Sequence, residues 1–250
     1  MTRPVTIKVG GVAGQHAASI GVIASEAPSD AVVVHGGGNE VADWSRRLGL
    51  VPRSHEGLRV TDPETLEVAV AVLAGLVNTR IVAALGAHGR RAIGLTGADG
   101  RLLDVRRREA ELGEVGEVIG ADADVLRPLL GAGLMPVVAS IGVDETGDLL
   151  NVNADEVAGA LAAARGGLLL LCTDVPGVLL DDTLVERLER TTAEQMLADG
   201  RASAGMRPKL RAALTAAEAG CDVRIVDGRA PNDLRKALAG SAAGTLVAAS

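Results

Sequence analysis

The segment Val5-Thr6-Ile7-Lys8-Val9 is followed directly by Gly10-Gly11, and Ala31-Val32-Val33-Val34-His35 is followed by Gly36-Gly37-Gly38. Both apolar segments have the composition of buried β-strands. Glycine has no Cβ, so main-chain N–H groups after each strand can approach a bound phosphate or carboxylate closely. Lys8 adds a full positive charge beside the first glycine pair. The two segments therefore predict an anion-binding edge on a sheet of buried strands.

Outside these segments, short β-like runs alternate with longer helical patterns. This alternation is typical of a mainly parallel sheet that helices cover on both faces. The sequence predicts strands over residues 5–9, 31–35, 91–95, 135–139, 168–172 and 222–226. It predicts helices over residues 16–26, 39–48, 63–88, 122–131, 155–165 and 206–219. The predicted fold class is therefore α/β.

Local signals refine this outline. Asp62 before Pro63 is a strong helix start, because the carboxylate caps free N–H groups and proline has no N–H to lose. We expect that helix to break near Gly75. Turn residues and the apolar positions after them predict antiparallel hairpins within residues 96–120. A hinge between two lobes is expected at residues 165–167, but no linker marks a domain boundary.

The composition predicts a globular protein without nucleic-acid or membrane partners. Of the 250 residues, 48% are hydrophobic and 23% charged, and the net charge of −7 argues against a nucleic-acid partner. With no Phe or Tyr and only Trp44, the chain has no aromatic platform for single-stranded bases. The longest aliphatic run, residues 168–171, is too short to span a bilayer. Cys172 and Cys221 read as buried, reduced thiols, so we expect a cytoplasmic protein.

Several common site signatures are absent from the sequence. It has no phosphate loop of the GxxxxGKS or GxxxxGKT form, and the glycines after His35 are not the GxGxxG of dinucleotide-binding enzymes. The four histidines are dispersed, no Cys or His spacing resembles a metal cage, and a G-x-S-x-G nucleophile motif is missing. Taken singly, His35 fits a hydrogen-bonded core histidine and Lys8 a strand end that reaches solvent.

Polar residues also gather in the second half of the chain. Asn151, Asn153 and Asp155 alternate before an alanine-rich helix, so an extended segment would place all three on one side. A helix cap accounts for one of them but not for all three. Thr173-Asp174-Val175-Pro176-Gly177 and Gly205-Met206-Arg207-Pro208-Lys209 each fit a plain turn when viewed alone.

In this order the motifs resemble those of the amino-acid kinase family, across essentially the whole chain. Each motif is weak alone, but so many in one order are specific. The matching segments are Ile7-Lys8-Val9-Gly10-Gly11, His35-Gly36-Gly37-Gly38, Gly57-Leu58-Arg59-Val60-Thr61, Leu73-Ala74-Gly75 with Val77-Asn78, Gly94-Leu95-Thr96-Gly97-Ala98-Asp99-Gly100, Gly113-Glu114-Val115-Gly116, Pro136-Val137-Val138 with Ser140-Ile141-Gly142-Val143, residues 151–155, residues 173–177, Gly205-Met206 with Lys209, and Asp227-Gly228-Arg229.

The resemblance is strongest to the members that phosphorylate N-acetyl-L-glutamate. It implies a three-layer αβα open sandwich with a mainly parallel central sheet, similar to carbamate kinase. It also implies one domain over residues 1–250, with a lobe of about 1–165 for the acyl-amino acid and a lobe of about 166–250 for ATP. The implied reaction is transfer of the γ-phosphoryl group of MgATP to a side-chain carboxylate, a step of arginine biosynthesis, with no tightly bound cofactor.

The resemblance also assigns roles to single residues. Lys8 and Lys209 would flank the transferring phosphoryl group, and Asp155 would orient both lysines. The residues implied for the acyl substrate are Gly37, Gly38, Arg59, Asn151 and Asn153. Those implied for ATP are Lys8, Gly10, Gly11, Thr173, Asp174, Val175, Pro176, Gly177, Val178, Leu179, Arg201, Ala202, Ser203, Gly205, Met206 and Lys209.

The chemistry of a carboxylate acceptor agrees with these residue types. A side-chain carboxylate with a solution pKa of about 4.3 is already ionised at neutral pH, so the acceptor needs no catalytic base. Two anions must instead be brought together, which lysines and main-chain amides achieve. Because no carboxylate cage is evident, we expect Mg²⁺ to be held by the ATP phosphates and water.

Other functions stay open at this point. The nearest is a lysine-biosynthesis kinase that phosphorylates an aminoadipyl or glutamyl group on an acidic carrier protein. The short segment of residues 53–60 keeps a Gly-Leu-Arg form that favours a small free substrate, although Arg53 also fits the carrier. A non-catalytic nucleotide sensor on this fold would need neither lysine. A dinucleotide-dependent oxidoreductase lacks its glycine fingerprint.

Assembly is also suggested by the resemblance. Family members that arginine inhibits carry an extra N-terminal helix that links dimers into a hexamer, whereas seven residues precede Lys8 here. The expectation is therefore a homodimer that arginine does not inhibit.

Overall fold

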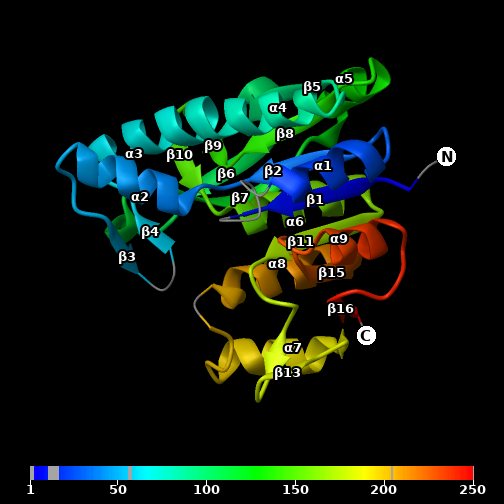
Figure 1. Cartoon of the computed structure of the whole chain (residues 1–250). Coiled ribbons are helices and arrows are strands. Elements are labelled where there is room, and N and C mark those ends of the chain that lie inside the picture. Colours follow the sequence, from blue (N-terminus) through cyan, green and yellow to red (C-terminus); the bar gives the residue numbers. More distant parts are fainter. Residues whose placement is uncertain (1–2, 11–16, 56–57, 204, 250) are drawn as a thin grey trace.

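A computed structural model describes residues 3–10, 17–55, 58–203 and 205–249. Its centre is an eight-stranded sheet, in which every pairing is parallel except that of β15 with β16 (Figure 1). Across the sheet the order is β14 (Arg187–Leu188), β16 (Thr245–Val247), β15 (Asp222–Asp227), β11 (Leu168–Thr173), β1 (Val5–Val9), β2 (Val32–His35), β8 (Met135–Ala139) and β5 (Ala92–Thr96).

Two hydrophobic cores lie on the two faces of this sheet. Successive strand residues point to opposite faces, so Val32 and Val34 of β2 enter one core and Val33 enters the other. The helices α1 (Ala17–Glu26), α4 (Asn78–Ala87) and α9 (Pro231–Leu238) cover the Val33 face. The helices α6 (Ala154–Arg165) and α8 (Met206–Glu218) cover the opposite face. The expected three-layer α/β sandwich is confirmed.

A small closed barrel adjoins the sheet. It contains β6 (Leu103–Arg107), β7 (Val115–Ala121), β9 (Ile141–Val143) and β10 (Leu149–Val152). The antiparallel pairing of β6 with β7 confirms the hairpin expected within residues 96–120. Short 3₁₀ turns flank these strands: η3 (Asp99–Arg101), η4 (Ala110–Leu112) and η5 (Ala123–Leu126). In this arrangement the side-chain amide of Asn151 in β10 donates to Oγ1 of Thr61 at 3.1 Å.

The remaining elements, two hairpins among them, lie outside the main sheet (Figure 1). The helix α2 (Gly38–Arg47) leads to the hairpin of β3 (Arg53–His55) and β4 (Leu58–Val60). A second hairpin contains β12 (Leu179–Leu180) and β13 (Thr183–Leu184), and α7 (Arg190–Ala198) follows it. The helices α7 and α9 and the strands β12 and β13 were not predicted from sequence, whereas the family resemblance implies the hairpin over residues 53–60.

The expected break near Gly75 is wrong. Asp62 caps the helix, since its carboxylate accepts the N–H of Thr65 at 2.9 Å, and the chain stays helical through α3 (Pro63–Val70), the π-helical segment η2 (Ala71–Val77) and α4. Inside η2, Val72, Leu73 and Val77 are buried. Their packing outweighs the cost of a helical glycine, about 1 kcal/mol relative to alanine.

The joined helix Pro63–Ala87 is both long and apolar. Its most apolar 18-residue window has a mean hydropathy of 2.0, so by length and composition alone the helix could cross a membrane. In the fold, Ile81 and Leu85 are buried in the core beside the sheet, and 44% of that window is buried. A core helix of a globular domain can also meet this criterion of length and composition.

Element boundaries otherwise follow the sequence within a residue or so. The predicted helix over 122–131 is a further exception, because the structure has η5 followed by only the five residues of α5 (Arg127–Gly131). Pro128 lies in the first turn of α5 and has no N–H to donate to an earlier turn. Residue 16 of the first predicted helix lies outside the described residues.

Candidate active site

Three charged side chains meet where β1 ends beside the start of α6. The ammonium of Lys8 lies 3.0 Å from Oδ1 of Asp155, and that of Lys209 lies 3.4 Å from Oδ2 of the same carboxylate. Lys8 comes from β1, Asp155 from the first turn of α6 and Lys209 from the first turn of α8. The side chains of all three are at most 13% exposed. The structure therefore brings together the three residues expected to be catalytic.

The electrostatics of this cluster leave a net positive charge. Burial alone would raise the pKa of Asp155, but the charges of Lys8 and Lys209 outweigh burial and hold the pKa below its ordinary value. Burial lowers the pKa of Lys209, and Asp155 partly restores it. With both ammonium groups charged against one carboxylate, the cluster carries one uncompensated positive charge suited to an anion.

Gly10 explains how Lys8 fits into this space. A Cβ built on Gly10 would lie 2.5 Å from Nζ of Lys8. A side chain at this position would push the ammonium from its place beside Asp155, so the absence of a Cβ matters more here than backbone freedom. Gly11, the second expected glycine of the pair, lies outside the described residues.

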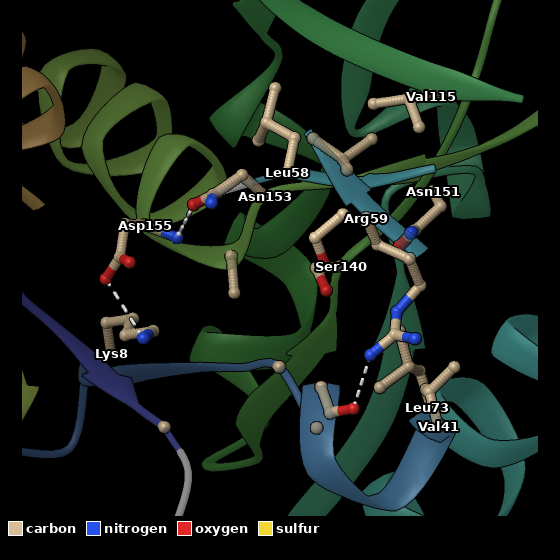
Figure 2. Close-up of a pocket in the computed structure, with 17 residues that line it drawn as sticks. Lys8, Val41, Leu58, Arg59, Leu73, Val115, Ser140, Asn151, Asn153 and Asp155 are labelled. Atoms are coloured by element: carbon tan, nitrogen blue, oxygen red, sulfur yellow. Dashed lines mark hydrogen bonds and ion pairs between the residues drawn. The ribbon is translucent and has the colours of Figure 1, made fainter. Parts of the chain in front are cut away.

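A pocket opens from this cluster toward the β3–β4 hairpin (Figure 2). Its wall includes every residue expected for the acyl substrate: Gly37, Gly38, Arg59, Asn151 and Asn153. Figure 2 shows Lys8 and Asp155 at one end and Arg59 and Asn151 at the other. A cation therefore stands at each end of the pocket.

Arg59 and Asn151 are held by their neighbours at the far end. The Arg59 guanidinium donates to the carbonyl of Gly38 at 2.6 Å, and its burial lowers the pKa of Arg59 from the ordinary value. The Asn151 amide donates to Oγ1 of Thr61 at 3.1 Å, and that hydroxyl donates to the carbonyl of Arg59 at 3.1 Å. Thr61 is fully buried and links the two polar residues.

Asp155 does not lie on the extended segment that holds Asn151 and Asn153, so the expectation of one extended segment for all three residues is wrong. The strand β10 ends at Val152, and Asn153 caps α6 by accepting the N–H of Asp155 at 2.8 Å. Asp155 is thus inside the first helical turn. Its side chain still reaches the pocket because the cap turns the chain there. The helix-cap interpretation of Asn153 is confirmed, and all three residues line the same pocket.

A second pocket lies on the other side of Lys8 and Gly10. The residues that line it are Lys8, Gly10, Asn39, Cys172, Thr173, Asp174 and Lys209. Thr173 ends the buried strand β11, and Asp174 is the exposed residue after it. Lys8 and Gly10 belong to both pockets, so a group bound in one can meet a group bound in the other.

The other residues expected for ATP do not line this second pocket. They are Val175, Pro176, Gly177, Val178, Leu179, Arg201, Ala202, Ser203, Gly205 and Met206. Val178 and Ala202 are core residues, and the main-chain N–H of Val178 donates to Oγ1 of Thr245 at 2.8 Å. Gly205 is hydrogen-bonded to the cluster, because its carbonyl accepts from Lys209 at 3.3 Å. The second pocket therefore does not extend to the remaining residues expected for ATP.

Three polar residues of the two pockets were given no role from sequence. Ser140 and Ser54 line the acyl-side pocket and Asn39 lines the second one. Ser140 follows the last residue of β8, where the end of a parallel strand was a usable signal. Ser54 and Asn39 are ordinary polar residues in the sequence, and only the fold brings them to the site.

The burial of His35 leads to a prediction about stability against pH. The His35 side chain is buried at the end of β2, and burial lowers its pKa from 6.5 to about 4. Between these values the unfolded chain binds a proton that the folded chain does not, so stability falls as the pH decreases from about 6.5 to about 4. A shift of this size corresponds to about 3 kcal/mol in the free energy of unfolding.

Urea unfolding of wild type and His35→Gln at several pH values measures this contribution. The difference in unfolding free energy between the two proteins should change across that pH window and be constant above it. His88→Gln is the matched control, because His88 is exposed. A pH dependence that His35→Gln leaves unchanged would contradict the assignment.

Comparison with known proteins places this site in a family. The model of the amino acid kinase family matches residues 7–227. The chain is 50% identical over 209 residues to a Methanopyrus kandleri protein named acetylglutamate kinase, covering 79% of this chain and 85% of that protein. A Rubrobacter xylanophilus protein of the same name is 45% identical over 249 residues, covering 98% of this chain and 97% of that protein.

The fold agrees with these sequence relatives. A crystal structure of a Streptococcus mutans protein superposes with a TM-score of 0.84 at 27% identity, and the match covers 99% of both chains. The sequence match spans both polar pockets, the two lysines and the carboxylate between them. The chain therefore belongs to the amino acid kinase family.

Proposed function

We propose that the protein is an acetylglutamate kinase. It transfers the γ-phosphoryl group of ATP to the side-chain carboxylate of N-acetyl-L-glutamate, which gives N-acetylglutamyl 5-phosphate and ADP. The observation that carries this proposal is a pocket with a cation at each end, Lys8 and Arg59, that shares Lys8 with a second polar pocket. A dicarboxylic acid fits the first pocket with one carboxylate near each cation. Relatives named acetylglutamate kinase support the choice of substrate.

In the proposed reaction the lysines reduce the repulsion between two anions. The acceptor carboxylate attacks the γ-phosphorus while the bond from that phosphorus to the bridging oxygen of ADP breaks. No proton has to leave the nucleophile, since the carboxylate is ionised at neutral pH. Lys8 and Lys209 stabilise the charge on the transferring group, and Asp155 holds both ammonium groups in place.

The acyl substrate would be oriented by the far end of the first pocket. Arg59 would pair with the α-carboxylate, and Asn151 would hold the acetylamino group beside it. The main-chain N–H groups of Gly37 and Gly38 would bind the acceptor end. The position of Arg59 at the end of the pocket opposite Lys8 supports its pairing with the α-carboxylate (Figure 2).

The binding of ATP and Mg²⁺ is the next part of the proposal. ATP would enter the pocket of Thr173, Asp174 and Lys209 and extend over the predicted nucleotide residues beyond it. We propose that residues of about 166–250 form the nucleotide lobe and residues of about 1–165 the acyl lobe. The described residues contain no group of three or more His, Cys, Asp or Glu side chains that would hold a metal. Mg²⁺ would therefore arrive with the ATP phosphates and water as its ligands.

An ADP-release assay tests the proposed function. The purified chain is given MgATP with N-acetyl-L-glutamate, L-glutamate, L-aminoadipate or an aminoadipyl group linked to an acidic carrier protein. We expect activity with N-acetyl-L-glutamate and little with the other acids. Activity with the carrier-linked acid alone would replace the proposal by the lysine-pathway reaction. ATP binding without turnover of any acid would indicate a nucleotide sensor.

Replacing Arg59 with alanine is expected to raise the KM for N-acetyl-L-glutamate by about 10²-fold, because the substrate loses a charge-assisted pair. The KM for ATP should stay within about twofold. Steady-state kinetics with each substrate varied in turn measures both values. Arg53→Ala is the control, since Arg53 is exposed and lies 3.7 Å from Asp62. An effect of Arg59→Ala confined to ATP would contradict the assignment.

We further propose that the protein acts in the cytoplasm, in arginine biosynthesis, and as a homodimer. Less than half of the most apolar window of the helix Pro63–Ala87 is buried, and β5 is an edge strand of the sheet. A second copy of the chain would cover both surfaces. Light scattering of the purified protein tests this assembly, and a mass of one subunit would contradict it.

A further inference from the structure

Gly36, Gly37 and Gly38 line the acyl-side pocket, and the residue before them forms a buried polar pair with a residue of α4. His35 ends β2 directly before Gly36, and its side chain lies on the Val33 side of the sheet, toward α4. The amide nitrogen of Asn78, the first residue of α4, lies 3.0 Å from Nε2 of His35. His35 is 1% exposed and Asn78 is 4% exposed. Neither residue lines the acyl-side pocket itself.

The contacts of this pair define a single tautomer of His35. The Nδ1 atom lies 2.9 Å from the carbonyl oxygen of Gly36, which can only accept, so Nδ1 carries the proton. The Nε2 atom is then an acceptor. The amide nitrogen of Asn78 donates one proton to Nε2 and the other to the carbonyl of Val137 in β8, at 2.8 Å. Both ring nitrogens of His35 and both amide protons of Asn78 thus have a hydrogen-bond partner.

The same helical segment also packs against the glycines of the pocket. A Cβ built on Gly37 would lie 2.8 Å from Cδ2 of Leu73 and 3.3 Å from Cγ2 of Val77, and both residues belong to η2. A π-helical segment has more residues per turn than an α-helix, so it sets where Asn78 lies relative to the start of the helix. Leu73 and Val77 therefore pack against Gly37, while Asn78 is hydrogen-bonded to His35.

We propose that Asn78 is a positioning residue for the acyl acceptor: it fixes His35 as the Nδ1–H tautomer, and through it the Gly36 carbonyl and the N–H groups of the following glycines. This inference rests on the proposed function, in which Gly37 and Gly38 bind the acceptor end of the substrate. Asn78 acts without touching substrate. The chemistry it supplies is donation toward Nε2, because a donor there requires the opposite ring nitrogen to carry the proton. The burial that lowers the pKa of His35 keeps this ring neutral at physiological pH.

Asn78→Asp separates donation from packing. The carboxylate keeps the shape of the amide but replaces the donating nitrogen by an oxygen that only accepts. We expect the KM for N-acetyl-L-glutamate to rise about tenfold, because Asn78→Asp loses the donations to His35 and to the Val137 carbonyl. The KM for ATP should stay within about twofold. Thr79→Ala is the control on the same helix, because Thr79 is exposed, and it should leave both values unchanged. Equal KM values in Asn78→Asp and wild type would overturn the proposal.

A second measurement does not depend on activity, and its wild-type part does not depend on the folding of any variant. Nitrogen-15 NMR of the imidazole rings in the wild-type protein at pH 7 reports which ring nitrogen of His35 carries the proton. We expect a neutral ring with the proton on Nδ1, and in Asn78→Asp a ring protonated at Nε2 together with shifted Gly36 to Gly38 amide signals. A wild-type His35 protonated at Nε2 would overturn the proposal. If the protein phosphorylated none of the tested acids, the proposed function would fail, and the NMR measurement would still test the tautomer of His35.

Discussion

Replacing Lys8 with alanine should lower kcat by about 10²–10³-fold, and replacing Lys209 should do the same. Each change removes one positive charge from the place where charge develops on the transferring phosphoryl group. Loss of a single preorganised donor at such a place costs on the order of 2.7–4 kcal/mol in the transition state. The KM values should change much less than kcat, because the charge matters most in the transition state. Steady-state ADP release with both substrates saturating measures the effect.

The matched control is Lys236→Ala, since Lys236 is an exposed lysine on α9. It should retain wild-type turnover. Lys8→Arg should not restore activity, because the ammonium already lies against Gly10 and a planar guanidinium is larger. Circular dichroism and the unfolding midpoint show whether the variants are folded. A folded Lys8→Ala or Lys209→Ala protein with near-normal kcat would exclude the proposed role of that lysine.

The sheet could be predicted from sequence because its inner strands are buried on both faces. Such strands form continuous apolar runs, and residues 168–172 and 31–35 are of this kind. The strands β14 and β16 at the far edge have only two and three residues, too short for a clear pattern. The helix α9 does carry a signal in the sequence, a proline in its first turn and Leu234 and Ala237 three residues apart. Gly75 is the opposite case, because its local preference favours a break and the packing of its neighbours keeps the chain helical.

The candidate site was predictable only in part, because its residues lie far apart in the sequence and meet only in the fold. Lys8 and Asp155 are brought together by the pairing of β1 in the sheet and by the start of α6, which no local pattern reveals, so their partnership came from the family resemblance. Thr61 and Asn78 are uncharged, and their hydrogen bonds reach residues 90 and 43 positions away. Contacts of this kind depend on the finished fold, so the sequence placed Thr61 and Asn78 in matching motifs without indicating which residues they position.

Replacing Asp155 with asparagine should have an effect of similar size and a distinct pH signature. The carboxylate holds both ammonium groups and raises the pKa of Lys209 against its burial and against the charge of Lys8. Without it, the two lysines repel each other and the pKa of Lys209 falls further below its ordinary value. We expect kcat to fall on the order of 10²-fold.

The sign of the pH effect follows from the form of Lys209 that acts. Only the protonated amine stabilises the transferring phosphoryl group, so activity is lost as the pH rises through the pKa of Lys209. A lower pKa in Asp155→Asn moves this loss to lower pH, which a kcat profile from about pH 6 to pH 10 would resolve. Glu156→Gln is the neighbouring control, because Glu156 pairs with Arg108 at 2.8 Å, away from both lysines. If Asp155→Asn lowered kcat while its alkaline limb stayed where wild type has it, Asp155 would be acting on packing alone and not on the charge of Lys209.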